Sequence, residues 1–186
     1  MLKEPRAGRV KTRLGREIGM VPAAWWFRHQ SRRLIRRLED RRWRLHLAVS
    51  PDRALCSRAW PAHLPRLPQG RGDLGMRMGR ILRGFPPGPV VIVGADIPGI
   101  AAPHIHRAFR ALGSHDAVFG PASDGGYWLI GMKRLAPPPR GLFEGVRWSS
   151  PTALSDTIAS LRGARFGLID TLSDVDTADD LRALSA

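Results

Sequence analysis

The sequence predicts an α/β protein with a mostly parallel central sheet flanked by helices. Apolar segments with strand character alternate with segments of helical periodicity, which is typical of a parallel sheet. The segment Val90–Val93 is continuously apolar, as expected for a strand buried on both faces. The length predicts a single domain, 1–186, without internal repeats or a dividing linker.

The first part of the chain predicts a basic loop, a long helix and a strand. Residues 1–20 are basic and contain glycine, which favours a loop. A helix is expected from Pro22, because proline suits a first helical turn, and apolar residues recur at helical spacing as far as Leu38. The alternating segment Trp43–Val49 predicts a strand, and Pro51–Pro68 predicts a proline-rich loop that could hold a short helix.

The second part begins with a glycine-rich turn, Gly70–Gly75, that opens a helix expected to reach Arg83. The strand Val90–Val93 follows. The remaining expected elements are a helix over Ala101–Leu112, strands at Ala117–Gly120 and Tyr127–Met132, a helix over Pro151–Leu161, a strand at Phe166–Asp170 and a last helix over Ala178–Leu184.

The chain is strongly basic, with a formal net charge of +14 and a sequence pI of about 11.6. The basic residues are almost all arginines spread along the chain, which indicates a general arginine bias rather than a basic tail. The three lysines are Lys3, Lys11 and Lys133, and two of them lie in the first eleven residues. A lysine retained against this bias hints at a site that uses a compact ammonium, for example on a phosphate oxygen.

The cysteine content and hydropathy predict the compartment. Cys56 is the single cysteine, so no disulfide forms within the chain, and a reducing compartment is expected. We find no signal-like segment and no apolar run of membrane-spanning length. The sequence therefore predicts a soluble cytoplasmic protein.

Two acidic residues are the strongest candidates for chemistry. Asp96 follows the buried strand Val90–Val93, and Asp124 lies in a glycine-rich turn between two apolar segments. A carboxylate at the carboxyl end of a strand faces the crevice where open α/β sheets bind ligands. Two such acids indicate a site for a hard divalent cation and the phosphates that it bridges. The alternative is that Asp96 caps the next helix and Asp124 only forms a turn.

The basic loop is a candidate for binding an anion. Gly8 would let backbone amides approach a pyrophosphate, and Lys3, Lys11 and Arg13 would neutralise it. The segment is not a P-loop, because Val10 rather than glycine precedes Lys11 and no strand is expected to lead into it. The alternative is a disordered basic terminus.

Further candidates lie near the C-terminus. Asp174 and Asp176 would share one face of an extended segment and could approach a cation held by Asp96, although Asp176 could also cap the last helix. Trp148 could form an apolar or stacking wall for a sugar or a base.

Several classes of enzyme are not supported. His104 and His106 would point to different faces of a helix, so a zinc site is not expected. The chain lacks the Gly-x-Ser-x-Gly turn of α/β hydrolases and the Gly-x-Gly-x-x-Gly motif of dinucleotide-binding proteins.

Six segments together resemble the DUF2064 family of glycosyltransferase-like proteins, also described as radical-SAM/selenodomain-associated transferases. They occur in order over nearly the whole chain: Lys3-x-Pro5-x-x-Gly8-x-Val10-Lys11-Thr12-Arg13-Leu14, Gln69-Gly70-x-Gly72-Asp73-Leu74-Gly75-x-Arg77-Met78, Gly94-x-Asp96-x-Pro98, Gly120-Pro121-x-x-Asp124-Gly125-Gly126-Tyr127, Trp148-Ser149 and Asp174-Val175-Asp176-Thr177. The resemblance implies the GT-A-like fold of nucleotide-diphospho-sugar transferases, to which some guanylyltransferases are also related.

The resemblance also implies roles for individual residues. Asp96 would bind the metal and be catalytic, with Asp174 or Asp176 as a second metal contact. Independently of the resemblance, Asp124 is a candidate catalytic residue, as a general base for the acceptor hydroxyl or as a group that positions that hydroxyl. The expected contacts to the nucleotide and the acceptor are Lys3, Gly8, Lys11, Thr12, Arg13, Gly72, Asp73, Arg77, Gly125, Gly126, Tyr127 and Trp148.

The chain departs from the family at its start. Members begin with an apolar strand before the Lys-x-Pro motif, whereas only Met1 and Leu2 precede Lys3 here. We therefore expect the first strand to be missing and the native chain to start upstream of Met1. Its absence would leave the neighbouring strands without a ladder partner.

The sequence thus predicts an enzyme that uses Mg²⁺ or Mn²⁺ to transfer a sugar from a nucleoside-diphosphate sugar to an unknown small acceptor. The alternative is nucleotidyl transfer from a nucleoside triphosphate to a phosphorylated acceptor, with release of pyrophosphate. A non-catalytic nucleic-acid-binding protein would fit the charge, but the chain lacks a recognition-module signature. We expect no specific nucleic-acid partner and no membrane span, and the sequence does not define an oligomeric state.

Overall fold

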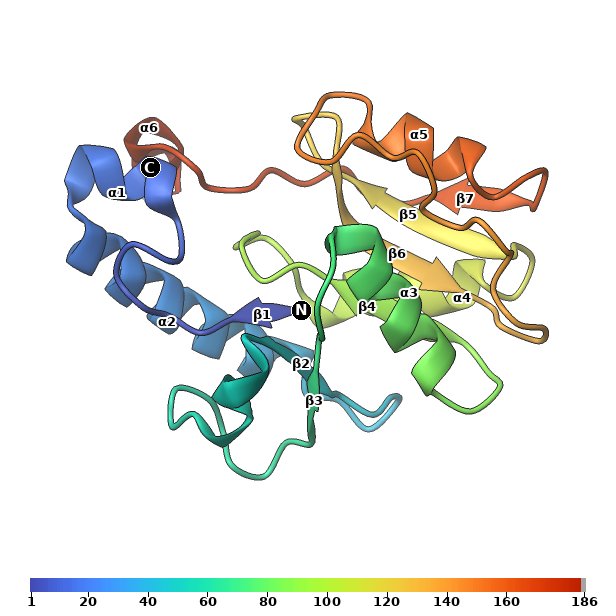
Figure 1. Cartoon of the computed structure of the whole chain (residues 1–186), viewed down its shortest axis with the longest axis horizontal. Coiled ribbons are helices and arrows are strands. Elements are labelled where there is room, and N and C mark those ends of the chain that lie inside the picture. The colour runs from blue at the N-terminus through green and yellow to red at the C-terminus, as the bar shows by residue number, and fades with distance from the viewer. Residues whose placement is uncertain (185–186) are drawn as a thin grey trace. The chain divides into compact units, whose positions relative to one another are not determined.

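The structure is a computed structural model that describes residues 1–184. Helices and strands alternate along the chain (Figure 1), which confirms the predicted α/β class. The chain divides into two compact units that are interleaved in sequence. Unit 1 consists of Met1–Pro68, Ala95–Ala101 and the residues from Asp174 onward, and unit 2 of Gln69–Gly94 and Ala102–Ser173. The single domain expected from the chain length stays a prediction.

Unit 1 contains a parallel sheet of three strands in the order β1-β2-β3. The strands are β1 (Leu2–Lys3), β2 (Leu47–Ser50) and β3 (Arg66–Pro68). The first strand, which we expected to be missing, is present as these two residues and pairs with β2. Strand β2 covers only the end of the segment predicted from Trp43. Strand β3 lies where the sequence predicts a loop, since three residues ending in proline carry no alternating pattern.

Three α-helices and a 3-10 helix complete unit 1 (Figure 1). Helix α2 (Met20–Leu38) forms where the apolar spacing predicts it and buries that apolar stripe. Helix α1 (Thr12–Ile18) replaces part of the basic loop that we expected over residues 1–20. It forms because Leu14 is fully buried. The others are η1 (Asp52–Cys56) and α6 (Ala178–Ala183).

Unit 2 contains a mixed sheet of four strands in the order β4-β6-β5-β7. The strands are β4 (Val90–Val93), β5 (Ala117–Pro121), β6 (Tyr127–Met132) and β7 (Phe166–Leu168). Strand β6 runs antiparallel to both β4 and β5, whereas β7 runs parallel to β5. The apolar run of β4 correctly predicts a strand but not a parallel neighbour, because the β5–β6 hairpin inserts β6 beside it.

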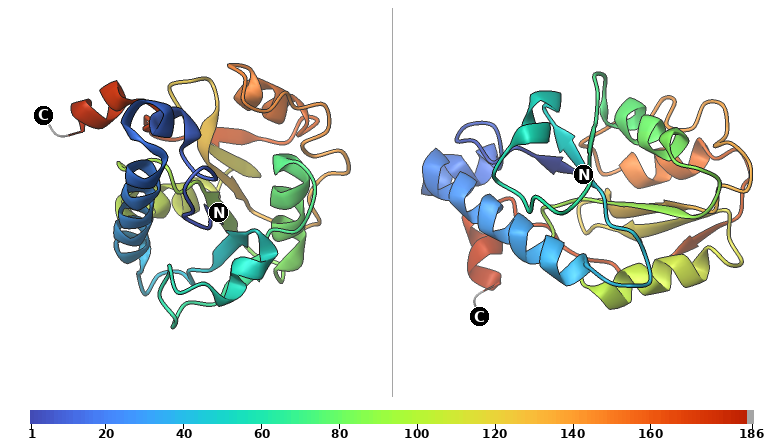
Figure 2. Two further views of the ribbon diagram at one scale, coloured as in Figure 1. Left: turned by 60° about the vertical axis from the view of Figure 1, so that its left-hand side comes forward. Right: turned by 90° about the horizontal axis from the view of Figure 1, so that it is seen from below.

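Helices cover both faces of this mixed sheet. Helices α3 (Leu74–Gly84) and α5 (Ala153–Ala159) lie on one face and α4 (Ala102–Ala111) on the other (Figure 2). The core of unit 2 includes Phe119, Trp128 and Leu129, which are almost completely buried. None of the helices within residues 1–184 combines the length and apolar character needed to cross a membrane.

Candidate functional site

A lysine ammonium lies between two carboxylates in unit 1. Lys11 Nζ is 2.8 Å from Asp176 Oδ1 and 3.4 Å from Asp96 Oδ2. The Lys11 side chain is only 5% exposed, whereas those of Asp96 and Asp176 are 48% and 35% exposed. Arg13 Nη1 approaches the other oxygen of Asp176 at 3.4 Å and is largely exposed. We call these four residues the charged cluster.

The loop after β1 holds Lys11 in an unusual backbone conformation. Lys11 is the N-cap residue of α1 and adopts left-handed angles, φ 45° and ψ 48°. This conformation costs a residue other than glycine roughly 1–2 kcal/mol. Buried Val10 before it and fully buried Leu14 after it hold the backbone in place. The Lys11 side chain is thus buried on a backbone that the neighbouring core residues hold in an unfavourable conformation.

Asp176 is fixed by the start of helix α6. Val175, beside it, is 2% exposed and anchors the segment. Thr177 and Asp180 form a capping box, and the Asp176 backbone N–H donates to Asp180 Oδ2 at 3.0 Å. The hydrogen bond from the Thr177 hydroxyl, followed by those from the Asp176 and Thr177 backbone amides, lowers the pKa of Asp180.

A contact with α1 ties this segment to the loop that carries Lys11. Glu17 Oε2 accepts a 2.7 Å hydrogen bond from the Ala178 backbone N–H. Helices α1 and α6 accordingly lie side by side (Figure 1). Both ends of the Lys11–Asp176 ion pair are thus held by the same pair of helices.

Asp96 lies in a short segment of unit 1 that follows β4 in sequence. Its neighbours Ala95 and Ile97 are buried. Arg37 of α2 donates through Nη2 to the Pro98 carbonyl oxygen at 2.6 Å. The next helix, α4, starts only at Ala102, so Asp96 does not cap it. Its partner is instead a side chain 85 residues away in sequence.

The charged cluster as it stands does not fit the divalent cation that we expected. Carboxylate oxygens suit Mg²⁺ or Mn²⁺, but the Lys11 ammonium lies between the two that gather here. Asp174 does not complete a set of ligands, since no three His, Cys, Asp or Glu side chains within residues 1–184 come together as a metal site.

The other predicted residues of the basic loop are exposed. Lys3 is the last residue of β1, Gly8 has a positive φ of 70°, and Thr12 is the first residue of α1. They belong to the same unit as the charged cluster. Their predicted contacts with a nucleotide stay predictions.

Three predicted residues in unit 2 form the start of helix α3. Asp73 is its N-cap and accepts a 2.8 Å hydrogen bond from the Met76 backbone N–H. Arg77 Nε donates to the Gly72 carbonyl oxygen at 2.9 Å, and Gly72 has a φ of +105°. These contacts explain Gly72, Asp73 and Arg77 by local structure, and their predicted binding roles are untested.

Asp124 is exposed and forms the turn between β5 and β6. Its Oδ1 accepts a 2.9 Å hydrogen bond from the Gly126 backbone N–H. Gly125 has a φ of +84°, and a Cβ there would lie 2.1 Å from the Pro151 carbonyl oxygen. The turn therefore requires glycine at this position, and it holds Asp124 by a contact within the turn itself.

Three aromatic side chains of unit 2, Phe143, Tyr127 and Trp148, form what we call the Trp148 cluster. The Trp148 ring centroid lies 6.0 Å from that of Phe143 and 6.4 Å from that of Tyr127. A Cβ at Gly75 would come within 2.6 Å of the Phe143 Cβ and 2.8 Å of Trp148 Cζ2. Burial raises the pKa of Tyr127, whose hydroxyl lies 3.3 Å from that of Thr157. Trp148 is thus held by packing and remains half-buried.

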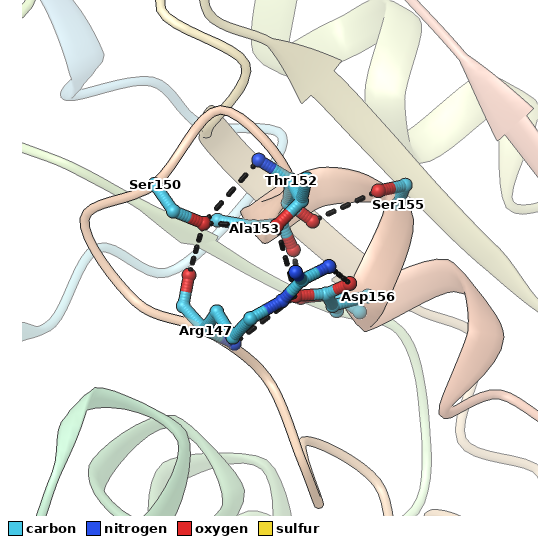
Figure 3. A network of polar contacts seen from close by, with 7 residues as sticks. Arg147, Ser150, Thr152, Ala153, Ser155 and Asp156 are labelled. Carbon is cyan, nitrogen blue, oxygen red and sulfur yellow. Dashed lines mark hydrogen bonds and ion pairs between the residues drawn. The ribbon is translucent and has the colours of Figure 1, made fainter.

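The loop that carries Trp148 is held by an ion pair that the sequence analysis missed (Figure 3). Arg147 donates through its guanidinium to both oxygens of Asp156, at 2.9 and 3.0 Å. The Thr152 hydroxyl donates to Asp156 as well. The hydrogen bonds from Arg147, with a smaller one from Thr152, lower the pKa of Asp156. No spacing rule relates residues nine apart across a loop, so this pair could not be predicted from the sequence.

The predicted site residues therefore fall into two groups. Unit 1 brings Lys11, Arg13, Asp96 and Asp176 together from three separate segments. Unit 2 contains the Asp124 turn, the start of α3 and the Trp148 cluster.

Comparison with known proteins identifies the family. The chain matches the family model DUF2064, described as uncharacterized proteins conserved in bacteria, over residues 34–150, which is more than half of its length. It therefore belongs to the DUF2064 family. A search of curated proteins found no match.

Solved structures support the fold. A crystal structure from Desulfovibrio desulfuricans G20, described as a proposed nucleotide-diphospho-sugar transferase, is 30% identical, with a TM-score of 0.85, over 98% of this chain and 83% of the other. The fold is accordingly α/β and GT-A-like, and the relationship supports a transferase at the level of class.

Two more distant structures share the fold alone. Rv0371c of Mycobacterium tuberculosis H37Rv is 15% identical, with a TM-score of 0.53, over 85% of this chain and 82% of the other. Its homologue from Mycobacterium sp. strain JC1 is 17% identical, with a TM-score of 0.55, over 85% and 80%.

Proposed function

We propose that this protein transfers a sugar from a nucleoside-diphosphate sugar to a small acceptor, and that the charged cluster binds the diphosphate. The observation that carries this proposal is the convergence of Lys11 and Arg13 with Asp96 and Asp176 in unit 1. The D. desulfuricans relative, a proposed nucleotide-diphospho-sugar transferase, supports the same class of donor.

The charges of the basic segment favour an anionic ligand. Within the cluster, two cations and two carboxylates cancel, but residues 1–20 as a whole carry six basic and two acidic side chains. Arg13 has a 71% exposed side chain and only a 3.4 Å contact with Asp176, so it is the cation most readily turned to a phosphate. Arginine binds phosphate oxygens with two parallel donors, which suits a diphosphate.

The chemistry expected of these residues is stabilisation of the leaving group. Sugar transfer breaks the bond between the anomeric carbon and the β-phosphate oxygen, so negative charge grows on the nucleoside diphosphate. Positioned cations lower the barrier where such charge develops. Asp124 remains our candidate for the general base on the acceptor hydroxyl, or for holding that hydroxyl in place.

Nucleotidyl transfer is the second candidate, because the same cations would serve a triphosphate donor. The two reactions differ in their products. Sugar transfer releases a nucleoside diphosphate, and nucleotidyl transfer releases pyrophosphate.

A thermal-shift panel tests the proposal. Nucleoside-diphosphate sugars and nucleoside triphosphates are added one at a time, each with and without Mn²⁺, because a ligand of the native state raises the melting temperature. We expect one nucleoside-diphosphate sugar to stabilise the wild type. We expect Lys133→Met, which removes a lysine of unit 2, to retain the shift.

Product analysis then follows with the stabilising donor. Release of the free nucleoside diphosphate supports sugar transfer. A shift with a triphosphate alone, together with release of pyrophosphate, would replace the proposal with nucleotidyl transfer. A folded protein that responds to none of the panel would contradict both.

A further inference from the structure

We propose that the Lys11 ammonium and a divalent cation are mutually exclusive occupants of the Asp96–Asp176 carboxylate pair. The ammonium lies within 2.8 and 3.4 Å of one oxygen of each carboxylate, and its side chain is 95% buried. Lys11 is thus a cation that contacts both carboxylates of the pair. This exclusion applies to the protein without nucleotide and does not depend on the proposed reaction.

The exclusion follows from distance and charge. Mg²⁺ and Mn²⁺ take oxygen ligands at about 2.0–2.2 Å and usually keep several waters. A hydrated ion between these two carboxylates would occupy the volume that the ammonium holds. The two positive charges would also repel each other at that separation. A divalent cation can therefore bind the pair only after Lys11 has left it.

Departure of Lys11 is costly. The ammonium would give up its contacts with both carboxylates, and the side chain is only 5% exposed. The backbone of Lys11 is also held in a left-handed conformation at the start of α1. The fraction of molecules with the carboxylates vacated is therefore small, and the apparent affinity for a metal falls in proportion to that fraction. In the absence of nucleotide, the wild type should bind Mn²⁺ weakly.

Lys11→Met tests this directly, because methionine keeps the length and apolar body of the side chain without its charge. Mn²⁺ binding is measured by the loss of the free Mn²⁺ resonance in electron paramagnetic resonance, without nucleotide. We expect Lys11→Met to bind one Mn²⁺ at least about tenfold more tightly than the wild type. The gain depends on how small the fraction of wild-type molecules is in which Lys11 has left the carboxylates. Equal or weaker binding by Lys11→Met would overturn the proposal.

Two controls assign the gain to the carboxylate pair. Lys133→Met removes a lysine whose described contact is with the Gly113 carbonyl oxygen in unit 2, and should leave Mn²⁺ affinity at the wild-type value. The double variant Lys11→Met/Asp96→Asn should lose the gain, because one carboxylate of the pair is neutral. A gain that survives in the double variant would place the ion elsewhere and contradict the proposal.

A measurement on the wild type serves if Lys11→Met does not fold. Acetic anhydride labels lysines according to their accessibility, and mass spectrometry reads Lys11 and Lys133 separately. Millimolar Mn²⁺ should raise the labelling rate of Lys11 several-fold relative to Lys133. Binding of Mn²⁺ to the pair without a change in Lys11 labelling would overturn the exclusion, whatever the outcome of the nucleotide panel.

Discussion

Asp96 and Asp124 look alike in the sequence, but the two units of the protein use them differently. Asp96 of unit 1 reaches an ammonium 85 residues away, next to a second carboxylate 165 residues from that ammonium. Asp124 of unit 2 accepts its hydrogen bond from the backbone two residues on. Both follow an apolar strand, and a glycine lies within two residues of each.

Local backbone structure explains the contact of Asp124 but not the contact of Asp96. The Asp124 contact belongs to a turn that would form around most aspartates at that position. The Asp96 contact requires three distant segments to fold together and includes a strained, buried lysine. No local turn or helix cap requires this arrangement. We therefore base our proposal on the charged cluster.

The largest effect that we expect is the loss of kcat in Asp96→Ala. Asp96→Ala should lower kcat by about 100-fold, because the Lys11 ammonium that stabilises the leaving diphosphate in our proposal loses a carboxylate that positions it, and misplacing a catalytic group by about 1 Å costs that much. The free energy of unfolding should fall by less than about 1 kcal/mol, because the carboxylate is half-exposed. Steady-state kinetics and thermal melts measure the two quantities.

The matched control for this variant is Asp179→Ala, which removes an exposed carboxylate from α6 of the same unit. It should leave kcat at the wild-type value. Full activity in Asp96→Ala would contradict the role that we give to the charged cluster.

Gly75→Ala should show that packing holds the Trp148 cluster of unit 2. The new Cβ would meet Phe143 and Trp148 at 2.6 and 2.8 Å. We expect a loss of about 1–3 kcal/mol in the free energy of unfolding by denaturant titration. Gly84→Ala, in the same helix with nothing within 4 Å of its Cβ, should instead leave stability unchanged or raise it slightly. Equal effects of the two changes on stability would mean that the Trp148 cluster rearranges around the new Cβ at little cost.

Asp124→Asn separates the charge of Asp124 from its part in the turn. Asparagine keeps an oxygen for the Gly126 N–H but removes the negative charge, so the turn and the melting temperature should be retained. If Asp124 serves the acceptor as we propose, kcat should fall by about tenfold or more. Unchanged kcat would assign Asp124 to the turn alone.

The smallest expected effect is the acid dependence of the Arg147–Asp156 pair. Its hydrogen bonds lower the pKa of Asp156 from the ordinary value of 3.8. The stability that it contributes is therefore present above pH 3.8 and is lost as the pH falls below that value. The melting temperature of the wild type should decline more steeply there than that of Asp156→Asn. Parallel curves would show that the pair adds nothing.

Much of the fold could be predicted from local pattern. The strands β4 and β6 have the predicted bounds, because their apolar runs end at glycine or charge. Helix α1 could not be predicted, since a seven-residue basic segment with an internal glycine has no periodicity beyond Leu14. The antiparallel neighbour of β4 depends on a hairpin that forms nearly thirty residues later in the chain.

The candidate site was predictable in composition but not in arrangement. Lysine retention points to Lys11 and the strand-end position to Asp96, and the acid-dense segment near the C-terminus offers Asp174 or Asp176. The cation between the two acids is Lys11 itself, and its contacts join residues 85 and 165 positions apart in the sequence. No spacing rule predicts contacts of that kind.

The most direct test of the central claim compares two arginines of helix α1. Arg13 contacts Asp176 and Arg16 lies three residues on, and both are exposed. Affinity for the nucleoside diphosphate of the stabilising donor is measured by calorimetry for Arg13→Gln and Arg16→Gln at one ionic strength. We predict a loss of about tenfold for Arg13→Gln, as for one charge-assisted phosphate contact, and a change within about twofold for Arg16→Gln. Equal losses of affinity in the two variants would mean that the overall positive charge, and not a specific contact of Arg13, binds the ligand. Unchanged affinity in Arg13→Gln would contradict the diphosphate site.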